Sequence, residues 1–364
     1  MLKTENTVKI EREAGDHMSR LLRRIPGLKA KLVNVDLRNV EPVDLVFELH
    51  GLASKRVIEV GCVVKLHGQP KYAREAYFDL MTWAAAGQSR VPVFIAPYLH
   101  PKSREFIESF AGNYLDFVGN ARLAFEQIYI ELASADVPKA AARELRSLFT
   151  PKAALVIRAL LRSVGKPWKV ADLAAETSVS LGQISNVIRA LNEREFAERG
   201  EGGVFLSDPN KLIEAWADAY RGVDGVVRSF HTTLHGKALE DALRHTLLAY
   251  QSGSDGNVVL ASFSAANWLA PYGRSNTTYF YADATGLENV IETLKLRPVT
   301  SGANVEITIP GDHGVFFDAV ALAPGVFCTS PIQTYLDLLL AGERGKEAAE
   351  FLKERIDLWQ PLTK

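Results

Sequence analysis

Four polar side chains share one face of a predicted helix near the middle of the chain. Gln183, Asn186 and Arg189 follow one another at three-residue spacing, and Ser185 lies beside them. The amides of Gln and Asn can pair bidentately with adenine, and a guanidinium can pair with guanine or with a phosphate. The sequence therefore indicates a surface suited to the base edges and backbone of double-stranded DNA.

The elements around these residues have the order of a winged helix-turn-helix. Helices are predicted at 151–161, 169–176 and 181–194, with a turn at 177–179 before the third. Thr150-Pro151 and Ser180 have the residue types that begin helices. Two short strands around Gly200–Gly203 then predict a hairpin, the wing. The apolar residues of the third helix, which we expect to pack inward, are Leu181, Ile184, Val187, Ile188 and Leu191.

The predicted contacts with DNA divide into base-reading and phosphate-binding groups. Ser180, Gln183, Ser185, Asn186 and Arg189 belong to the third helix, whose N-terminal residues should lead into the major groove. The residues that we expect to bind phosphates are Lys152, Lys166, Lys169 and Arg199. Glu201 at the tip argues against deep insertion of the wing.

The chain has almost no net charge, but its basic residues are concentrated in one segment. The net charge is −1, yet the segment Lys139–Arg199 holds 11 basic and 6 acidic residues. A basic segment inside an otherwise acidic chain places the electrostatic attraction to DNA on one module. A basic helix face can equally be an ordinary solvated surface, and winged helices also bind proteins, so a protein-binding adaptor remains an alternative.

Composition limits the remaining classes of function. The 364 residues are 47% hydrophobic, enough for about two or three domains. Cys62 and Cys328 form no CxxC pair, so we expect neither a disulfide framework nor a structural zinc site. The sequence has no apolar run of about 18 residues, and its start lacks the apolar segment of a signal peptide. We expect a cytoplasmic protein without membrane contact, cofactor or metal.

Alternating strands and helices on both sides of the central module predict a multidomain protein of α/β and α+β class. Val91–Ala96 is an apolar run of the kind found in buried parallel strands. The second α/β region has predicted strands at 257–261, 278–282, 305–309 and 326–329. The predicted organisation is an N-terminal helix at 1–24, an α/β domain at 25–134, a connecting helix at 135–149, the winged helix-turn-helix at 150–221 and a C-terminal α/β domain at 222–364.

Several segments together resemble one bacterial family. VIEVGCVVKLHGQPKYAREA, PVFIAPYLHPKSREFI and YLDFVGNARL are similar to the restriction-endonuclease-like domain that precedes a winged helix in proteins labelled type IV toxin–antitoxin antitoxin, AbiE type, or transcriptional regulator. SLGQISNVIRALNERE and SPIQTYLDLLLAGERGKEAAEFL fit the same family, so the resemblance covers nearly the whole chain. It implies an antitoxin-like DNA-binding regulator, with a cognate toxin or a second copy of the chain as candidate protein partners.

The nuclease motif implied by the first domain is incomplete. Such a site needs an acid on one strand and Glu/Asp-x-Lys on the next, because carboxylates hold Mg²⁺ and the lysine steadies the attacking water. Asp44 and Lys65 match, but Val63 stands where the second acid belongs, and Glu59 lies six residues before Lys65. Gln69 remains suited to a phosphate contact. We expect an inactive, vestigial nuclease site, and a metal-dependent nuclease using Asp44, Glu59 and Lys65 remains an alternative.

The family resemblance implies a nucleotidyltransferase-type fold for the C-terminal domain, but the motif for that chemistry is incomplete. A working transferase needs Gly-Ser followed by Asp-x-Asp, because two metals grip the triphosphate. The chain has Ser262 and Ser264, but the next aspartate, Asp283, stands alone in TYFYADATG with no Asp pair. We interpret Asp312 and Asp318 as surface-loop residues. The catalytic motifs of both α/β domains are thus incomplete, and the sequence predicts a DNA-binding regulator rather than an enzyme.

Overall fold

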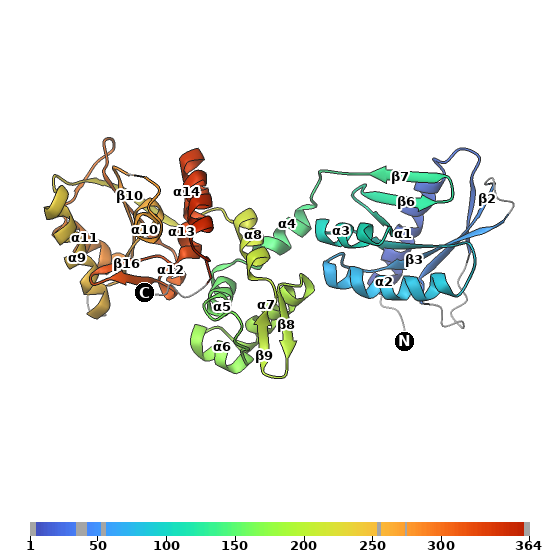
Figure 1. The fold of residues 1–364 in the computed structure, drawn as a ribbon, viewed down its shortest axis with the longest axis horizontal. Coiled ribbons are helices and arrows are strands. Elements are labelled where there is room, and N and C mark those ends of the chain that lie inside the picture. Colours follow the sequence, from blue (N-terminus) through green and yellow to red (C-terminus); the bar gives the residue numbers. More distant parts are fainter. Residues whose placement is uncertain (1–4, 34–41, 52–55, 253–255, 274, 360–364) are drawn as a thin grey trace. The chain divides into compact units, whose positions relative to one another are not determined.

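The protein is mixed α/β with two large sheets and one hairpin (Figure 1). The computed structural model describes residues 5–33, 42–51, 56–252, 256–273 and 275–359. The chain divides into two compact units. The first comprises Met1–Glu144 with Ala190–Glu195, and the second comprises Leu145–Arg189 with Phe196–Lys364.

The first unit contains a seven-stranded sheet whose strands follow chain order. Its three middle strands are parallel to one another, and the remaining neighbours are antiparallel. The predicted strand at 91–96 is one of these middle strands and is buried, as its continuous apolar run indicates. The strands are β1 Lys29–Val33, β2 Leu45–His50, β3 Ile58–Val64, β4 Arg90–Ala96, β5 Asn113–Asp116, β6 Ala121–Phe125 and β7 Ile128–Leu132.

Helices cover both faces of this sheet and create two cores. Helix α1 (Glu5–Leu22) packs Met18 and Leu22 against Val60 and Cys62 of β3. Helices α2 (Pro70–Ala85) and α3 (Pro101–Ser109) cover the other face, where α2 packs Trp83 against Val63 of the same strand. The alternation of side chains along β3 thus serves both cores.

The N-terminal helix predicted at 1–24 is α1. Its residue Val8 is 55% exposed, because it lies in the first turn, before the part of the helix that meets the sheet. Strand β1 ends at Val33, and residues 34–41 lie outside the described part of the chain.

Residues 150–208, which we call the central module, form three short helices and a hairpin, and all of them except Ala190–Glu195 belong to the second unit. The hairpin is anchored close to its turn: Trp168 N donates to Val204 O at 2.7 Å, and Val204 N donates to Trp168 O at 2.8 Å. Helix α4 (Lys139–Ser147) precedes the module, and α8 (Pro209–Ala219) follows it. The module consists of α5 Pro151–Leu161, α6 Val170–Thr177, α7 Leu181–Glu193, β8 Ala197–Gly200 and β9 Gly203–Leu206.

The C-terminal part of the second unit contains the other seven-stranded sheet, in the order β13-β10-β14-β12-β11-β16-β15. Two pairs are parallel (β12 with β14, β11 with β16), and the other four neighbouring pairs are antiparallel. The four strands predicted in this region are β11, β12, β14 and β16. The strands are β10 Gly225–His231, β11 Val258–Leu260, β12 Thr278–Ala282, β13 Arg297–Pro298, β14 Val305–Pro310, β15 Val320–Ala323 and β16 Val326–Cys328.

Helices pack against this sheet around a core that includes Phe280, Val305 and Ile307, all at most 1% exposed. Helix α13 packs against both α10 and α14. The helices are α9 Gly236–Ser252, α10 Ser262–Leu269, α11 Ala284–Thr293, α12 Gly314–Phe317, α13 Pro331–Leu339 and α14 Gly342–Arg355.

The contact between Gly61 and Trp83 provides a test of the first unit. A Cβ at position 61 would lie 2.6 Å from Cη2 and Cζ3 of Trp83, which is 2% exposed and has little room to move. We expect Gly61→Ala to lower the free energy of unfolding by about 1–3 kcal/mol, as overpacked cores do. Urea denaturation followed by circular dichroism measures the change.

Gly15→Ala is the matched control in the same unit. A Cβ there would meet Leu45 Cδ1 at 3.8 Å, an ordinary van der Waals contact, and Gly15 lies inside α1. Alanine should therefore stabilise this helix by about 0.5–1 kcal/mol. Equal stability of the two variants would contradict the close packing of β3 against α2.

Candidate nucleic-acid interface

A tight turn positions the start of α7. The N–H of Ser178 donates to Ala174 O at 2.9 Å and ends α6, with Ser178 in the left-handed conformation at φ 55°. Ser180 Oγ then accepts from the N–H of Gln183 at 3.4 Å. The hydroxyl thus satisfies one of the N–H groups that a helix start leaves without a partner.

Helix α7 has one buried and one exposed face. Ile184, Val187 and Ile188 are at most 8% exposed and form its buried face, and Leu191 is buried as well. The opposite face brings together the predicted base-reading residues, which are all exposed: Gln183, Ser185, Asn186 and Arg189. This face offers hydrogen-bond donors and acceptors to a groove.

A hydrogen bond links two of these side chains. Arg189 Nη2 donates to Asn186 Oδ1 at 3.1 Å. The bond joins residues one turn apart, so it orients the guanidinium along the exposed face of α7. The remaining N–H groups of the Arg189 guanidinium can donate to a base or a phosphate.

Leu181 does not pack inward, contrary to the sequence expectation. It continues the stripe of Ile184 and Ile188, but its side chain is 56% exposed. The apolar stripe extends past the end of the module's core, and no atom lies within 4 Å of the position that a Cβ of the neighbouring Gly182 would take. An exposed aliphatic side chain beside polar ones is suited to the methyl group of thymine. Sequence periodicity alone assigned this residue to the core.

The predicted phosphate-binding cations are all exposed, and most of them are near the hairpin. Lys166 and Lys169 flank Trp168, which bonds to Val204, and Val204 is paired with Arg199 across the hairpin. Lys166 Nζ lies 4.8 Å from the centre of the Trp168 ring. Lys152 lies separately, in the first turn of α5. The neighbouring Thr150 does not cap α5 with its side chain; its Oγ1 donates to Ser147 O at 3.0 Å instead.

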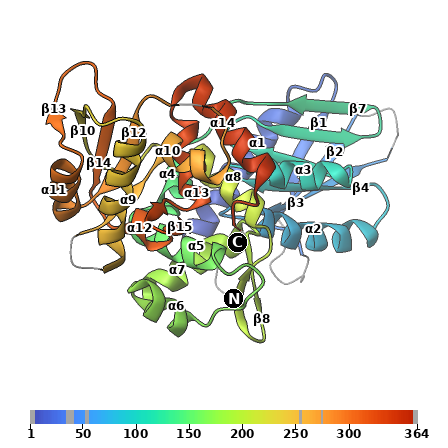
Figure 2. The same cartoon turned by 60° about the vertical axis from the view of Figure 1, so that its left-hand side comes forward.

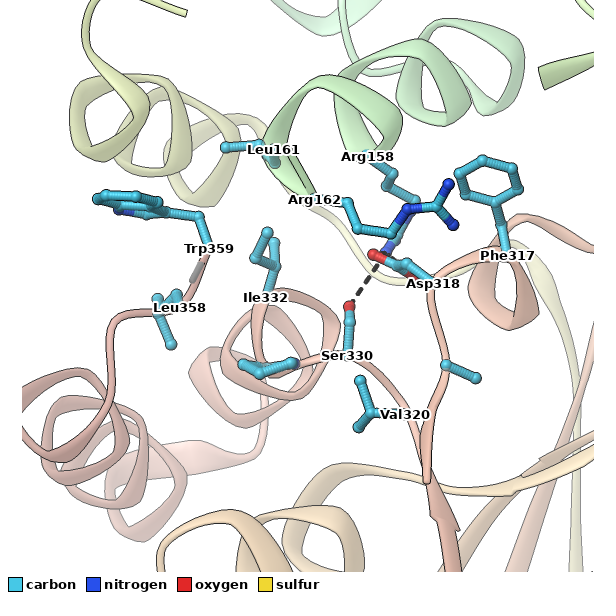
Figure 3. A pocket seen from close by; sticks show the side chains of 12 residues that line it. Arg158, Leu161, Arg162, Phe317, Asp318, Val320, Ser330, Ile332, Leu358 and Trp359 are labelled. Atoms are coloured by element: carbon cyan, nitrogen blue, oxygen red, sulfur yellow. Dashed lines mark hydrogen bonds and ion pairs between the residues drawn. The ribbon is translucent and has the colours of Figure 1, made fainter. Parts of the chain in front are cut away.

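A buried ion pair fixes α5 to the C-terminal part of the unit. Arg158 is 4% exposed, and its Nη1 donates to both oxygens of Asp318 at 2.9 Å. The same nitrogen lies 3.5 Å from Ser330 Oγ (Figure 3). Nη2 donates to Gln333 Oε1. The expectation that Asp318 is a surface-loop residue is therefore wrong. A signal was present, since Arg158 stands alone in the apolar run AALVIRALL, and a buried charge requires a partner.

The hydrogen bonds continue from Gln333 to a buried carboxyl. Gln333 Nε2 donates to Asp337 Oδ1 at 2.7 Å, and the hydroxyls of Tyr220 and Tyr281 donate to the same oxygen at 2.8 and 3.0 Å. Burial raises the pKa of Asp337 to about 6, although these three bonds partly offset it. Burial likewise raises the pKa of Tyr220 and that of Tyr281. The network connects α5 of the central module with α13 and with the segment after α8.

Asp283 and Asp312, two other acids that the sequence singled out in the C-terminal domain, accept hydrogen bonds from backbone N–H groups. Asp283 begins α11 and accepts from Gly286 N at 2.8 Å and from Asn257 N and Nδ2 at 2.9 and 2.6 Å. Burial acts against ionisation, but these bonds keep the pKa of Asp283 below its usual value. Asp312 accepts from Gly314 N at 2.8 Å. Throughout the described ranges, no three His, Cys, Asp or Glu side chains gather as a metal would require.

The expected vestigial nuclease residues are divided between the two ends of β3. Asp44 Oδ2 accepts from Val64 N at 2.8 Å near the end of the strand, and Lys65 Nζ lies 3.9 Å from Asp79 Oδ2 just beyond it. Glu59 lies near the start, where it pairs with Arg90 Nε at 2.9 Å. Gln69 Nε2 donates to Glu144 Oε2 at 3.1 Å. The structure thus groups Asp44 with Lys65 and leaves Glu59 apart.

Comparison with known proteins connects the second unit to one family. Residues 205–357 match the family of transcriptional regulators described as AbiEi antitoxins of type IV toxin–antitoxin systems. The match starts in β9 and extends past α14, so it supports the antitoxin family that the sequence resembles and leaves the first unit outside. No curated protein and no solved structure matches the chain. None of the described helices is long and apolar enough to cross a membrane.

The buried carboxyl of Asp337 predicts a pH dependence of stability. Its folded pKa of about 6 exceeds the usual unfolded value, so between about pH 4 and pH 6 the folded state keeps a proton that the unfolded state has lost. The proton held by Asp337 therefore contributes fully to the free energy of unfolding at low pH, and this contribution is lost as pH rises through 6. Relative to Asp337→Asn, which does not titrate, the wild type should lose about 3 kcal/mol between pH 4 and pH 7.

Denaturant unfolding of both proteins at several pH values measures this difference. Asp241→Asn, at an exposed position in α9, is the matched control and should follow the wild type. Parallel curves for wild type and Asp337→Asn would contradict a raised pKa at this position.

Proposed function

We propose that the central module is a winged helix-turn-helix and that the chain is a DNA-binding transcriptional regulator of antitoxin type. The observation that carries this proposal is α7, whose base-reading side chains are exposed while its apolar face is buried. The match of residues 205–357 to an antitoxin family of transcriptional regulators supports the same function. A β-hairpin follows α7 directly, as a wing does.

In this proposal α7 enters the major groove with its first turn leading. Gln183 and Asn186 hydrogen-bond to adenine edges, and Arg189 pairs with guanine or a phosphate. The exposed Leu181 contacts a thymine methyl group. Sequence preference then arises from the exposed face of a single helix.

Phosphate contacts orient the module on the duplex. Ser180 lies at the start of α7, where helix N–H groups and a hydroxyl attract a phosphate oxygen. Lys152, Lys166, Lys169 and Arg199 are exposed cations that bind neighbouring phosphates. Glu201 keeps the tip of the wing out of the minor groove, since its carboxylate repels the DNA backbone.

The two α/β domains act as scaffolds in this proposal. The first is restriction-endonuclease-like, with a vestigial site at Asp44, Lys65 and Gln69. Glu59 forms an ion pair with Arg90 at the other end of β3. The second is nucleotidyltransferase-like, and its Asp283 caps a helix rather than pairing with a second acid. Double-stranded DNA and a cognate toxin are the proposed partners.

Arg189→Ala should weaken binding to a DNA duplex by at least about tenfold, because a guanidinium contact with guanine or phosphate is lost. The duplex is chosen by gel-shift selection from a randomised library with the wild-type protein. Gln183→Ala and Asn186→Ala should alter the selected sequence. The affinity of each variant is measured by fluorescence anisotropy.

Lys346→Ala in α14 removes an exposed cation outside the module and should leave the affinity unchanged. Binding should also fall steeply as salt is raised, because phosphate contacts release counterions. Wild-type affinity in all three α7 variants would refute the proposal. Absence of any DNA binding would favour a protein-binding adaptor.

The nuclease alternative leads to a separate test. Glu59 is held away from Asp44 and Lys65, so supercoiled plasmid incubated with the protein and Mg²⁺ or Mn²⁺ should remain intact. Agarose electrophoresis detects a nick. Metal-dependent nicking that disappears in Lys65→Ala would show that the first domain is an active nuclease after all.

A further inference from the structure

Strand β10 has a backbone edge that no neighbouring strand covers. It pairs with β14 from Gly225 to Phe230, but on its other side β13 reaches Phe230 and His231 alone (Figure 2). Val299 N adds one bond to Ser229 O at 3.1 Å. Within the described part of the chain, no strand pairs with the outer side of residues 225–228.

The hydrogen bonds show which backbone groups point outward. Asp224 O accepts from Gly311 N, and Phe230 O accepts from Asn304 N, so the even-numbered residues direct their backbone towards β14. Ser229 O accepts from Val299 on the opposite side. Gly225 and Val227 therefore direct their N–H and C=O groups outward, since the direction alternates along a strand.

This edge is also apolar and exposed. Val226 and Val227 are 58% and 60% exposed, and Gly225 and Arg228 are exposed as well. Soluble proteins usually protect such an edge with prolines, inward charges or a covering element, because it readily pairs with another strand. In this case the exposed segment offers a surface for pairing.

We propose that a second copy of this chain pairs antiparallel with β10, with a two-fold axis at Val226. In this register Gly225 bonds with Val227 of the second copy through both backbone groups, and Val227 bonds with Gly225 of the second copy in the same way. All outward N–H and C=O groups of these residues are then satisfied. The two Val226 side chains face each other as a non-hydrogen-bonded pair.

Charge complementarity identifies the occupant as a second copy. The same register sets Asp224 opposite Arg228 of the second copy, twice, because the two-fold axis repeats the pair. Both residues are exposed, and no ion pair of either occurs within the described residues. Cross-strand pairs of opposite charge stabilise a sheet. The segment Asp-Gly-Val-Val-Arg is thus complementary to itself when it runs antiparallel.

The structure disfavours the neighbouring symmetric register. An axis at Val227 would set Gly225 opposite Ser229 and would require the Ser229 carbonyl, which already accepts from Val299. It would also move Asp224 away from Arg228. The axis at Val226 is therefore the one that uses the open backbone groups and the charges together.

Cysteine substitution tests the register in the full-length protein. Val226→Cys should form an intermolecular disulfide on air oxidation, because the Cα atoms of a non-hydrogen-bonded pair lie about 4.5 Å apart, within disulfide range. Val227→Cys is the matched control: its two copies would be diagonal neighbours about 7–8 Å apart and should not cross-link. The native Cys62 and Cys328 are buried. Non-reducing electrophoresis reads the result.

Charge reversal tests the same register without a cross-link. Sedimentation equilibrium should show a wild-type dimer, and Asp224→Arg or Arg228→Asp should each weaken it by at least about tenfold. The double variant Asp224→Arg/Arg228→Asp should restore the dimer. Val227→Pro removes an outward N–H and leaves the β14 ladder intact, so it should dissociate the dimer without unfolding the chain.

Each outcome decides the proposal independently of DNA binding, because no DNA is present. A monomeric wild type, or equal cross-linking at positions 226 and 227, would overturn it. A double variant that stays monomeric while its circular dichroism is native would also overturn it and would indicate that the edge serves a different partner.

Discussion

The position of the central module depends on one buried ion pair. A guanidinium in the middle of an apolar helix loses its hydration, and only a well-placed carboxylate with further hydrogen bonds can offset that cost. Arg158 finds both in Asp318, Gln333 and Ser330, which come from a different part of the chain. Because an unpaired charge there would be strongly unfavourable, α5 can dock in one way. Removing either partner would leave a buried charge without compensation, so the pair fixes the place of α5.

The module also has an apolar interior. Helix α5 buries Ile157 and Leu160, and α7 buries Ile184 and Ile188. The DNA contacts proposed for α7 require such rigid support, because hydrogen bonds to base edges tolerate little displacement.

Local patterns predicted the elements better than the contacts between them. The period of α7 identified Ile184 and Ile188 as buried, but it failed at Leu181, because periodicity does not show where a core ends. Strand β10 was missed, because most of its residues are exposed and lack the in–out alternation of a half-buried strand.

At the candidate site, too, local patterns predicted the features of single elements but not the contacts between distant residues. Exposure of the residues proposed to contact DNA was predictable from residue type, and the hydrogen bond between Asn186 and Arg189 followed from helical spacing. The Arg158–Asp318 pair joins residues 160 positions apart, and no local pattern encodes that separation. Likewise, Thr150 has the residue type of a cap, yet its hydroxyl bonds backward to Ser147.

The anchoring of the hairpin determines where the module can change in length. Gly203 has φ 128°, and a Cβ on it would lie 2.2 Å from Trp168 O, so the bridge at Trp168 and Val204 fixes the returning strand residue by residue. An insertion between Gly203 and Leu206 would shift that strand by one position and turn its buried side chains outward. The turn at Glu201-Gly202 is held as closely, because a Cβ on Gly202 would lie 2.8 Å from Pro167 Cγ. Extra residues at the tip or along β9 would therefore disturb the contact of the hairpin with Pro167 and Trp168.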